Sequence, residues 1–265
     1  MLVDFHSHTY KSDGNISPAE LAASMAARGV RWYSVTDHDT LAAYAELPVL
    51  PQLVRGVEIN TSFAGQDVHI LGYKLPSQPS SLDAALARHQ QARRERIEEM
   101  IARLCAAGLP LTWDDVVSQA PGAHALGRPH LANALVYRGY ATSIQDALTR
   151  YLKSGGRGYV PSARVTPLDA IRMIREVDGI PVLAHPGRLS DVSILPTLVE
   201  AGIRGIEVFY PTHTAAQIID FRHAAAAYNL VMTAGADFHD VAWTPWGVGM
   251  EVAEADITPF LEMLV

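Results

Sequence analysis

Short apolar runs and amphipathic stretches alternate in the first and last parts of the chain. Runs rich in aliphatic and aromatic residues are typical of buried strands, whereas apolar residues that recur every three or four positions indicate helices. Strands are expected at residues 2–5, 32–35, 53–59, 68–73, 180–184, 205–209 and 230–234. Helices are expected at residues 18–27, 41–46, 167–177, 195–201 and 215–228. This alternation predicts an α/β fold built from βαβ units.

The middle of the chain has a different pattern. Residues 82–109 form one long helical pattern rich in Arg, Glu, Gln and Ala, and further helices are expected to begin near residues 112, 128 and 143. No convincing strand is found between residues 82 and 157. We therefore expect a main domain of residues 1–81 and 158–265, and a helical insertion of residues 82–157 that caps the active site.

Polar side chains follow the first predicted strand. His6 and His8 end this strand. Because residues i and i+2 of an extended segment point to the same side, both imidazoles can reach one ion. Ser12, Asp13 and Gly14 then form a turn that adds a carboxylate. Polar side chains crowded at a strand end indicate a metal or phosphate site.

Other predicted strands deliver further residues of the same types. The nine candidate ligands are His6, His8, Asp13, His38, Glu58, His69, His185, Asp237 and His239. Strand ends converge on one face of a barrel, so we expect these side chains to meet. Mixed nitrogen and oxygen ligands suit Zn, Mn, Fe or Co and disfavour a pure Ca site. Each residue alone could be a turn residue, a cap or a core histidine. Together they predict two or three ions and an anionic substrate such as a phosphate.

Composition excludes several other classes of protein. With 49% hydrophobic and 18% charged residues, the chain can form a sizeable core. A net charge of −7 argues against a broad basic face for duplex DNA. The single cysteine, Cys105, rules out a disulfide framework. The N-terminus lacks a signal-peptide pattern, and no apolar run reaches the ~18 residues of a membrane span. A cytoplasmic protein without membrane contact is expected.

The same polar segments resemble the motifs of the PHP (polymerase and histidinol phosphatase) family. The matching segments are residues 4–9, 12–14, 36–40, 56–59, 184–186 and 235–239. They span nearly the whole chain outside the helical insertion. The resemblance implies a distorted (β/α)7 TIM-like barrel with a trinuclear metal centre. It also implies phosphoesterase activity through attack by a metal-bridging hydroxide.

The resemblance further implies how the ligands share the ions. One ion would be held by His6, His8, Glu58 and Asp237. Glu58 would bridge to a second ion, held with His69 and His185. The third would be held by Asp13, His38 and His239. Two or three divalent ions are expected per chain, with manganese favoured and iron, zinc and magnesium left open.

Segments of the insertion resemble one branch of that family, the nucleoside 3',5'-bisphosphate phosphatases. These segments are residues 127–132, 151–153 and 158–161. The branch removes the 3'-phosphate of compounds such as adenosine 3',5'-bisphosphate, and some members trim short RNA from the 5' end. The implied partner is a small phosphorylated nucleotide. The candidates for binding it are Ser12, Arg128, His130 and Lys153, with Arg157 and Arg164 as weaker candidates.

Several other residues have two interpretations. Asp37 and Asp39 could orient a neighbouring imidazole or cap the end of a strand. His213 could donate a proton or lie at the surface. Tyr137 and Trp113 could stack against a base or pack between helices.

The sequence also allows three rival functions. The first is a histidinol phosphate phosphatase, which shares the family but not the substrate. The second is an amidohydrolase-type barrel hydrolase, although such enzymes often bridge their metals with a carboxylated lysine where this chain offers Glu58. The third is a non-catalytic metal-binding or polymerase-accessory module, which fewer than two bound metals per chain would favour.

Overall fold

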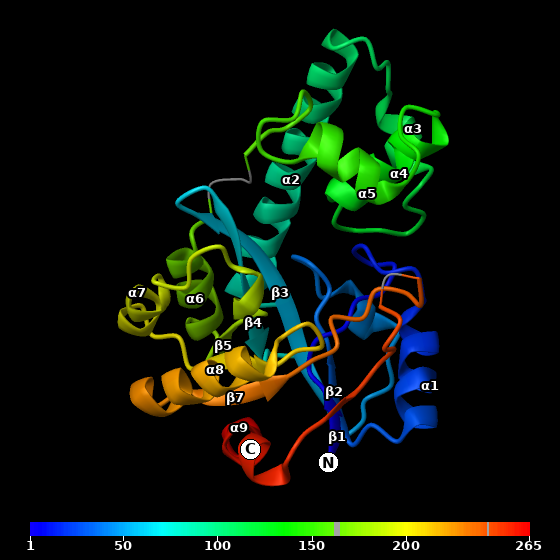
Figure 1. Ribbon diagram of the computed structural model, residues 1–265. Coiled ribbons are helices and arrows are strands. Elements are labelled where there is room, and N and C mark those ends of the chain that lie inside the picture. The colour runs from blue at the N-terminus through cyan, green and yellow to red at the C-terminus, as the bar shows by residue number, and fades with distance from the viewer. Residues whose placement is uncertain (162–164, 243) are drawn as a thin grey trace.

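Eight strands form one curved sheet in the computed structural model, which describes residues 1–161, 165–242 and 244–265 (Figure 1). The strands are β1 (Leu2–Asp4), β2 (Trp32–Val35), β3 (Leu53–Phe63), β4 (Gln66–Tyr73), β5 (Ile180–Leu183), β6 (Gly205–Phe209), β7 (Val231–Ala234) and β8 (Met250–Glu251). Their order across the sheet is β7-β6-β5-β4-β3-β2-β1-β8. The first seven strands agree with the sequence prediction, whereas the short β8 was not predicted.

Backbone hydrogen bonds between the two ends of the sheet nearly close it into a barrel. The Phe5 amide donates to the Ala234 carbonyl, the Asp237 amide to His6, and the His8 amide to Phe238, each at 2.8 Å. These bonds join the segment after β1 to the segment after β7. The expected distorted barrel of seven strands is therefore confirmed, with β8 paired outside it on the start of β1.

The distortion lies at β3 and β4. These strands form an antiparallel hairpin, and β4 also runs antiparallel to β5, whereas the other barrel strands pair in parallel. Ala64 and Gly65, the two residues between the strands, have φ angles of 48° and 83°, as a tight primed turn requires. Both strands extend further toward this turn than the apolar runs predict, and no helix separates them.

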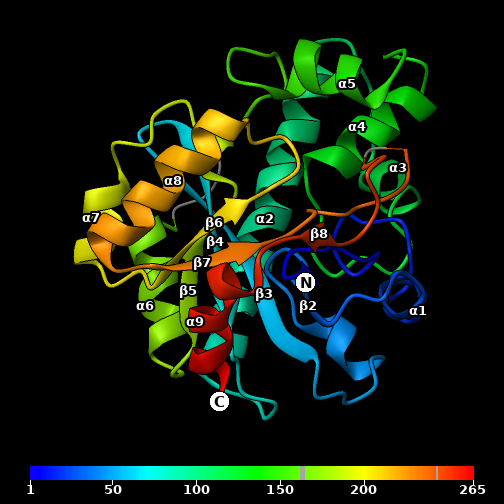
Figure 2. The ribbon, with the colours of Figure 1, turned by 60° about the horizontal axis from the view of Figure 1, so that its bottom comes forward.

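Helices cover the outside of the barrel (Figure 2). They are α1 (Pro18–Arg28), α6 (Pro167–Arg175), α7 (Leu195–Glu200), α8 (Ala215–Tyr228) and α9 (Glu254–Leu264), with short 3-10 turns η1 (Ala42–Ala45) and η3 (Pro186–Arg188). The predicted start of α1 is confirmed, because the Ser17 side chain accepts from the Glu20 amide and Pro18 is the first helical residue. The C-terminal α9 was not predicted. Helices α6, α7, α8 and α9 bury their apolar faces on the strands in one shared core, whereas Leu21 and Met25 of α1 pack in a separate cluster with β2.

The long helix α2 (Ser81–Ala106) belongs to two hydrophobic cores. Leu82 and Leu86, near its start, pack in the barrel core. Its second half, from Ile97 to Leu104, packs in a separate core. The partners there are α3 (Trp113–Val117), α4 (Arg128–Tyr137), α5 (Ile144–Ala147) and the π-helical turn η2 (Leu148–Leu152). Figure 1 shows α2 leading from the barrel to this helical cluster, so one helix joins the two parts.

None of the helices in the described ranges is long and apolar enough to cross a membrane.

Candidate metal centre and active site

All nine candidate ligands converge at one end of the barrel. His6 and His8 follow β1, and His38, His185, Asp237 and His239 follow other strands, as predicted. Glu58 and His69 differ from the prediction, since they lie inside β3 and β4 rather than at strand ends. The antiparallel hairpin explains how they still reach the site. His69 pairs with Asn60 in the register, two residues from Glu58, so both side chains lie at the same level of the barrel.

The Glu58 carboxylate is at the centre of this set and is 1% exposed. Its Oε1 lies 2.8 Å from His69 Nδ1 and 3.1 Å from His185 Nε2. Its Oε2 lies 3.2 Å from the Nε2 atoms of His6 and His8, and 3.0 Å from His38 Nδ1. Burial alone would raise the pKa of Glu58, but these imidazoles outweigh it and hold the pKa well below its usual value. The carboxylate is thus ionised, and its two oxygens face different ligand groups.

One group of four ligands surrounds a shared point. Asp237 Oδ1 lies 3.3 Å from His6 Nε2 and 3.2 Å from His8 Nε2, and Glu58 completes the group. Both Nε2 atoms are buried and have no hydrogen-bond partner among the described residues. Ligands placed ~2.0–2.2 Å from a tetrahedral ion lie roughly 3.3–3.6 Å apart. These separations and orphaned nitrogens therefore fit a bound metal ion.

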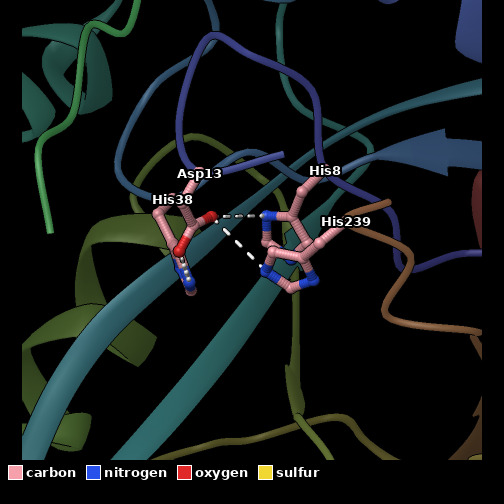
Figure 3. Close-up of side chains that lie close together, drawn as sticks. All are labelled: His8, Asp13, His38 and His239. Atoms are coloured by element: carbon pink, nitrogen blue, oxygen red, sulfur yellow. Dashed lines mark ion pairs between the residues drawn. The ribbon is translucent and has the colours of Figure 1, made fainter. Parts of the chain in front are cut away.

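A second group forms around Asp13 (Figure 3). Asp13 Oδ1 lies 3.7 Å from His8 Nδ1 and 3.4 Å from His239 Nε2, and its Oδ2 lies 3.6 Å from His38 Nε2. The rings of His8 and His239 stack with centroids 4.2 Å apart. His38 stands between the two carboxylates, since its other nitrogen faces Glu58. A third group, His38, Glu58 and His69, shares members with both, so the three groups form one continuous cluster.

Buried acids outside the nine hold the cluster in place. Glu207 accepts from His6 Nδ1 at 3.1 Å and from the His185 amide at 2.7 Å. Asp4 accepts from the amides of His6, Ala236 and Gly249. Glu207 and Asp4 lie within predicted strands, and the sequence pattern does not distinguish them from packing residues.

Asp37 has a comparable role on the loop that carries Asp13. It accepts from the Thr9 amide, the Thr9 hydroxyl and the Ser12 hydroxyl, each at 2.7 Å. The sequence left open whether Asp37 orients an imidazole or caps a strand end. The structure instead places its carboxylate against the hydroxyls and amide of the 9–12 turn.

Similar proteins were found by sequence and by structure, although no family model matches the chain. The chain is 33% identical, over 90% of its length and 94% of the relative's, to a phosphoribosyl 1,2-cyclic phosphate 1,2-diphosphodiesterase of Eggerthella lenta. It is 30% identical to a 3',5'-nucleoside bisphosphate phosphatase of Chromobacterium violaceum, over 97% of the chain and 92% of that protein. It is 32% identical to the 5'-3' exoribonuclease Rnm of Salmonella typhimurium, over 93% and 87%.

A crystal structure of a metal-dependent phosphoesterase from Bifidobacterium adolescentis superimposes with a TM-score of 0.85 at 28% identity, covering 99% of this chain and 96% of that one. The chain belongs to the PHP family of metal-dependent phosphoesterases. This assignment agrees with the ligand cluster and the barrel. The PHP enzyme hydrolyses phosphate esters with the help of bound metal ions, and its His, Asp and Glu groups can bind them.

The candidate ligands form the floor of a pocket of about 510 Å³. Seven of the nine candidate ligands line it, together with the basic residues Arg93, Arg96, Arg128, Lys153 and Arg188. Arg93, Arg96 and Arg188 were not singled out from the sequence, because their distance from the cluster depends on how α2 and η3 pack. His89, Tyr210 and Trp246 also line the pocket and were likewise not predicted.

The predicted substrate-binding residues occupy different positions. Arg128 and Lys153 line the pocket. Ser12 is 1% exposed and donates to Asp37, whereas the His130 Nδ1 accepts from the Gly127 amide at 2.9 Å. Neither Ser12 nor His130 is among the residues that line the pocket. Arg164 lies outside the described residues.

The two candidate stacking residues also lie away from the pocket. Tyr137 is 70% exposed on α4. Trp113 packs beside the core of the helical cluster, and the Arg94 guanidinium lies 4.6 Å from its ring centroid. His213 uses both ring nitrogens, one near the Val208 carbonyl and one accepting from the Gly187 amide.

Replacing Glu207 by glutamine should weaken metal binding. Glutamine has one acceptor oxygen for the two donors that Glu207 serves, so the His6 ring or the His185 amide loses its partner. Losing such an orienting group costs about 10- to 100-fold in metal affinity or activity. Titration of the apoprotein with Mn²⁺ measures this, with the exposed Glu200→Gln as a matched control. Equal affinity of the two variants would contradict the orienting role of Glu207.

Proposed function

We propose that this PHP enzyme removes the 3'-phosphate from nucleoside 3',5'-bisphosphates, leaving a nucleoside 5'-phosphate and inorganic phosphate. The observation that carries the proposal is the pocket's charge distribution. Candidate metal ligands lie at its floor, and four basic side chains, Arg93, Arg96, Arg128 and Lys153, come from α2 and the helical cluster. A substrate with two separate phosphates can use both regions at once. We therefore propose that residues 82–157 cap the active site.

The basic side chains lack enough carboxylates to neutralise them. Arg128 pairs with Asp67 at 2.6 Å. Arg96 instead donates to the Val160 carbonyl at 3.0 and 2.8 Å, with no ion pair among the described residues. Burial and the nearby Arg128 lower the pKa of Arg96 to about 10, a sign of crowded positive charge. A phosphate dianion relieves that crowding, and guanidinium groups bind it with paired hydrogen bonds.

We propose that the nine candidate ligands hold two or three divalent ions, with manganese favoured. Bound ions of this kind polarise a phosphate ester and supply hydroxide at neutral pH. The chain's own residues have three tasks. Glu58 and Asp237 keep negative charge between the imidazoles, Glu207 fixes the His6 ring, and Arg188, which donates to Asp237 Oδ2 at 3.1 Å, directs its remaining donors at the phosphate.

The relatives support this class of substrate and suggest a second candidate. Their names describe a nucleoside bisphosphate, a phosphoribosyl cyclic phosphate and RNA. All three substrates carry a phosphate ester on a ribose. Trp246 offers a ring that is 36% exposed beside the pocket, a surface suited to stacking on a base. We therefore favour a nucleotide, with short RNA as a second substrate and no duplex DNA.

The deciding experiment measures phosphate release from Mn-loaded protein. The substrates are adenosine 3',5'-bisphosphate, AMP, histidinol phosphate, phosphoribosyl 1,2-cyclic phosphate and a 5'-phosphorylated RNA trimer. We expect the bisphosphate to have the highest kcat/KM. A higher value for histidinol phosphate or for the cyclic phosphate would overturn the proposed substrate. Release of mononucleotides from the trimer at a rate comparable to that of the bisphosphate would make short RNA a second substrate.

Arg128 should matter only for substrates that carry a second phosphate. A charge-assisted hydrogen bond contributes about 1.5–3 kcal/mol, so Arg128→Ala should lower kcat/KM for adenosine 3',5'-bisphosphate by about 10- to 100-fold. With 3'-AMP, which lacks the 5'-phosphate, the change should be small. Arg138→Ala is the matched control, because Arg138 follows α4 but does not line the pocket. Equal losses with both substrates would place Arg128 at the reacting phosphate instead.

A further inference from the structure

His89 is a histidine in the pocket that the metal cluster does not use. The chain has 11 histidines, and six belong to the candidate ligands. Of the other five, His89 alone is among the described residues that line the pocket. It lies on α2 and is 6% exposed. Its position therefore differs from that of His213 and His130, whose ring nitrogens bind backbone groups elsewhere.

The His89 ring is held by a buried carboxylate. Its Nδ1 lies 2.8 Å from Asp39 Oδ1, and Asp39 is fully buried on the loop after β2. A carboxylate accepts only, so Nδ1 carries the proton of this bond. The described residues provide no hydrogen-bond partner for Nε2. The carboxylate thus orients the ring and keeps a proton on Nδ1, while Nε2 is left for a ligand in the pocket.

Asp39 is itself fixed from several sides. Its Oδ2 accepts from Arg93 at 2.7 Å, and its Oδ1 accepts from the Asn60 amide at 3.1 Å. The Gln90 side chain donates to its backbone carbonyl at 2.8 Å. These bonds come from both the barrel and α2. The Asp39–His89 pair is therefore preorganised across the junction between them, as a catalytic proton donor requires.

We propose that His89, oriented by Asp39, is the general acid that protonates the leaving oxygen of the substrate. The proposal rests on the proposed phosphoester hydrolysis. A water oxygen forms the new bond to phosphorus, and the bond from phosphorus to the ribose oxygen breaks. The electron pair of the broken bond stays on the ribose oxygen, which takes the Nε2 proton of His89. The attacking water releases its proton to solvent, and solvent returns a proton to His89.

Other groups in the pocket are less suited to this step. The Tyr210 hydroxyl already donates to Asp237 Oδ2 at 2.9 Å, and arginine side chains keep their protons at any physiological pH. Apart from the candidate metal ligands, Lys153 is the other titratable donor in the described lining, and it has no carboxylate to orient it in the part of the chain that is described. An alkoxide is a poor leaving group, so the reaction gains from a donor at this position.

The test compares two leaving groups in otherwise identical substrates. Adenosine 3',5'-bisphosphate releases a ribose oxygen, whereas its 3'-S-phosphorothiolate analogue releases a thiolate that needs no proton. His89→Gln should lower kcat for the oxygen ester by about 10²- to 10⁴-fold and change kcat for the sulfur ester little. Asp39→Asn should show the same selectivity. The exposed His223→Gln on α8 is the matched control and should leave both values unchanged.

A second measurement does not depend on activity. The Nδ1 proton shared with Asp39 should give a slowly exchanging downfield ¹H NMR signal in the metal-free protein, absent in His89→Gln and present in His223→Gln. Equal losses of kcat on both esters, with native circular dichroism and metal content, would overturn the role of His89 alone. Absence of the NMR signal would do the same. Failure of the wild-type enzyme to hydrolyse either ester would overturn the proposed function as well.

Discussion

Glu58→Gln is expected to abolish activity and to reduce the bound metal. The Glu58 carboxylate lies within 3.2 Å of nitrogens on five histidines, and no other side chain in the cluster reaches so many. Glutamine removes its charge and directs an amide N–H₂ group at imidazole nitrogens. Metal ions contribute several kcal/mol to the reaction, and each 1.36 kcal/mol is a factor of ten. We expect kcat/KM to fall by at least about 10³-fold.

The measurement pairs phosphate release with metal content by mass spectrometry. Glu262→Gln, an exposed substitution on α9, is the control and should behave as the wild type. Unchanged metal content in Glu58→Gln together with full activity would contradict a role for Glu58 in metal binding and in the reaction. Loss of activity with full metal content would assign it a role in the reaction but not in binding.

Metal loading is expected to raise the melting temperature, and more so at higher pH. One ion at 100 times its Kd adds about 2.7 kcal/mol to the free energy of unfolding, which corresponds to about 5–11 °C for a chain of this size. In the metal-free protein, burial would lower the pKa of His8, but the Asp237 and Glu58 carboxylates beside its ring outweigh it and raise the pKa to about 10. Bound metal must displace that proton.

The direction of the pH effect follows from this pKa. Because the folded-state pKa of His8 lies above its unfolded value of about 6.5, the proton stabilises the metal-free fold below pH 6.5. That stabilisation is lost as the pH rises through 10. The difference in melting temperature between Mn-loaded and metal-free protein should therefore grow from pH 6 to pH 9. Differential scanning fluorimetry measures it, with Glu58→Gln as the variant that should respond least. A difference in melting temperature that stays constant from pH 6 to pH 9 would contradict competition between the His8 proton and the metal.

Most of the ligand cluster could be predicted because strand ends converge in a barrel. The apolar runs locate the strands, and the polar residues that follow each run can be identified directly from the sequence. The direction of β4 could not be predicted, because parallel and antiparallel strands can have the same apolar pattern. His69 was therefore placed at a strand end, although it lies within β4. The hairpin nevertheless brings His69 to Glu58, so it belongs to the cluster.

The residues that the sequence did not reveal depend on packing between distant segments. Glu207 follows the alternating pattern of an ordinary strand, and only the closed barrel places it beside His6 and His185. His89 and Arg93 lie among many polar residues on α2, and no periodicity identifies which of them face the barrel. Both reach Asp39 because the start of α2 packs into the barrel core. Side-chain type was thus informative at strand ends and ambiguous on the long helix.

The backbone hydrogen bonds that close the barrel determine when the ligand group can assemble during synthesis of the chain. The segments they join, residues 5–8 and 234–238, include His6, His8 and Asp237, so barrel closure and assembly of this ligand group are one event. At about 5–20 residues per second, a ribosome needs roughly 10–50 s to pass from the first segment to the last. During that interval His6, His8 and Glu58 are present without Asp237, the fourth member of their group. A nascent chain therefore gains its full affinity for metal only after residues 234–238 have been made, and the bound ions then mark a completed barrel.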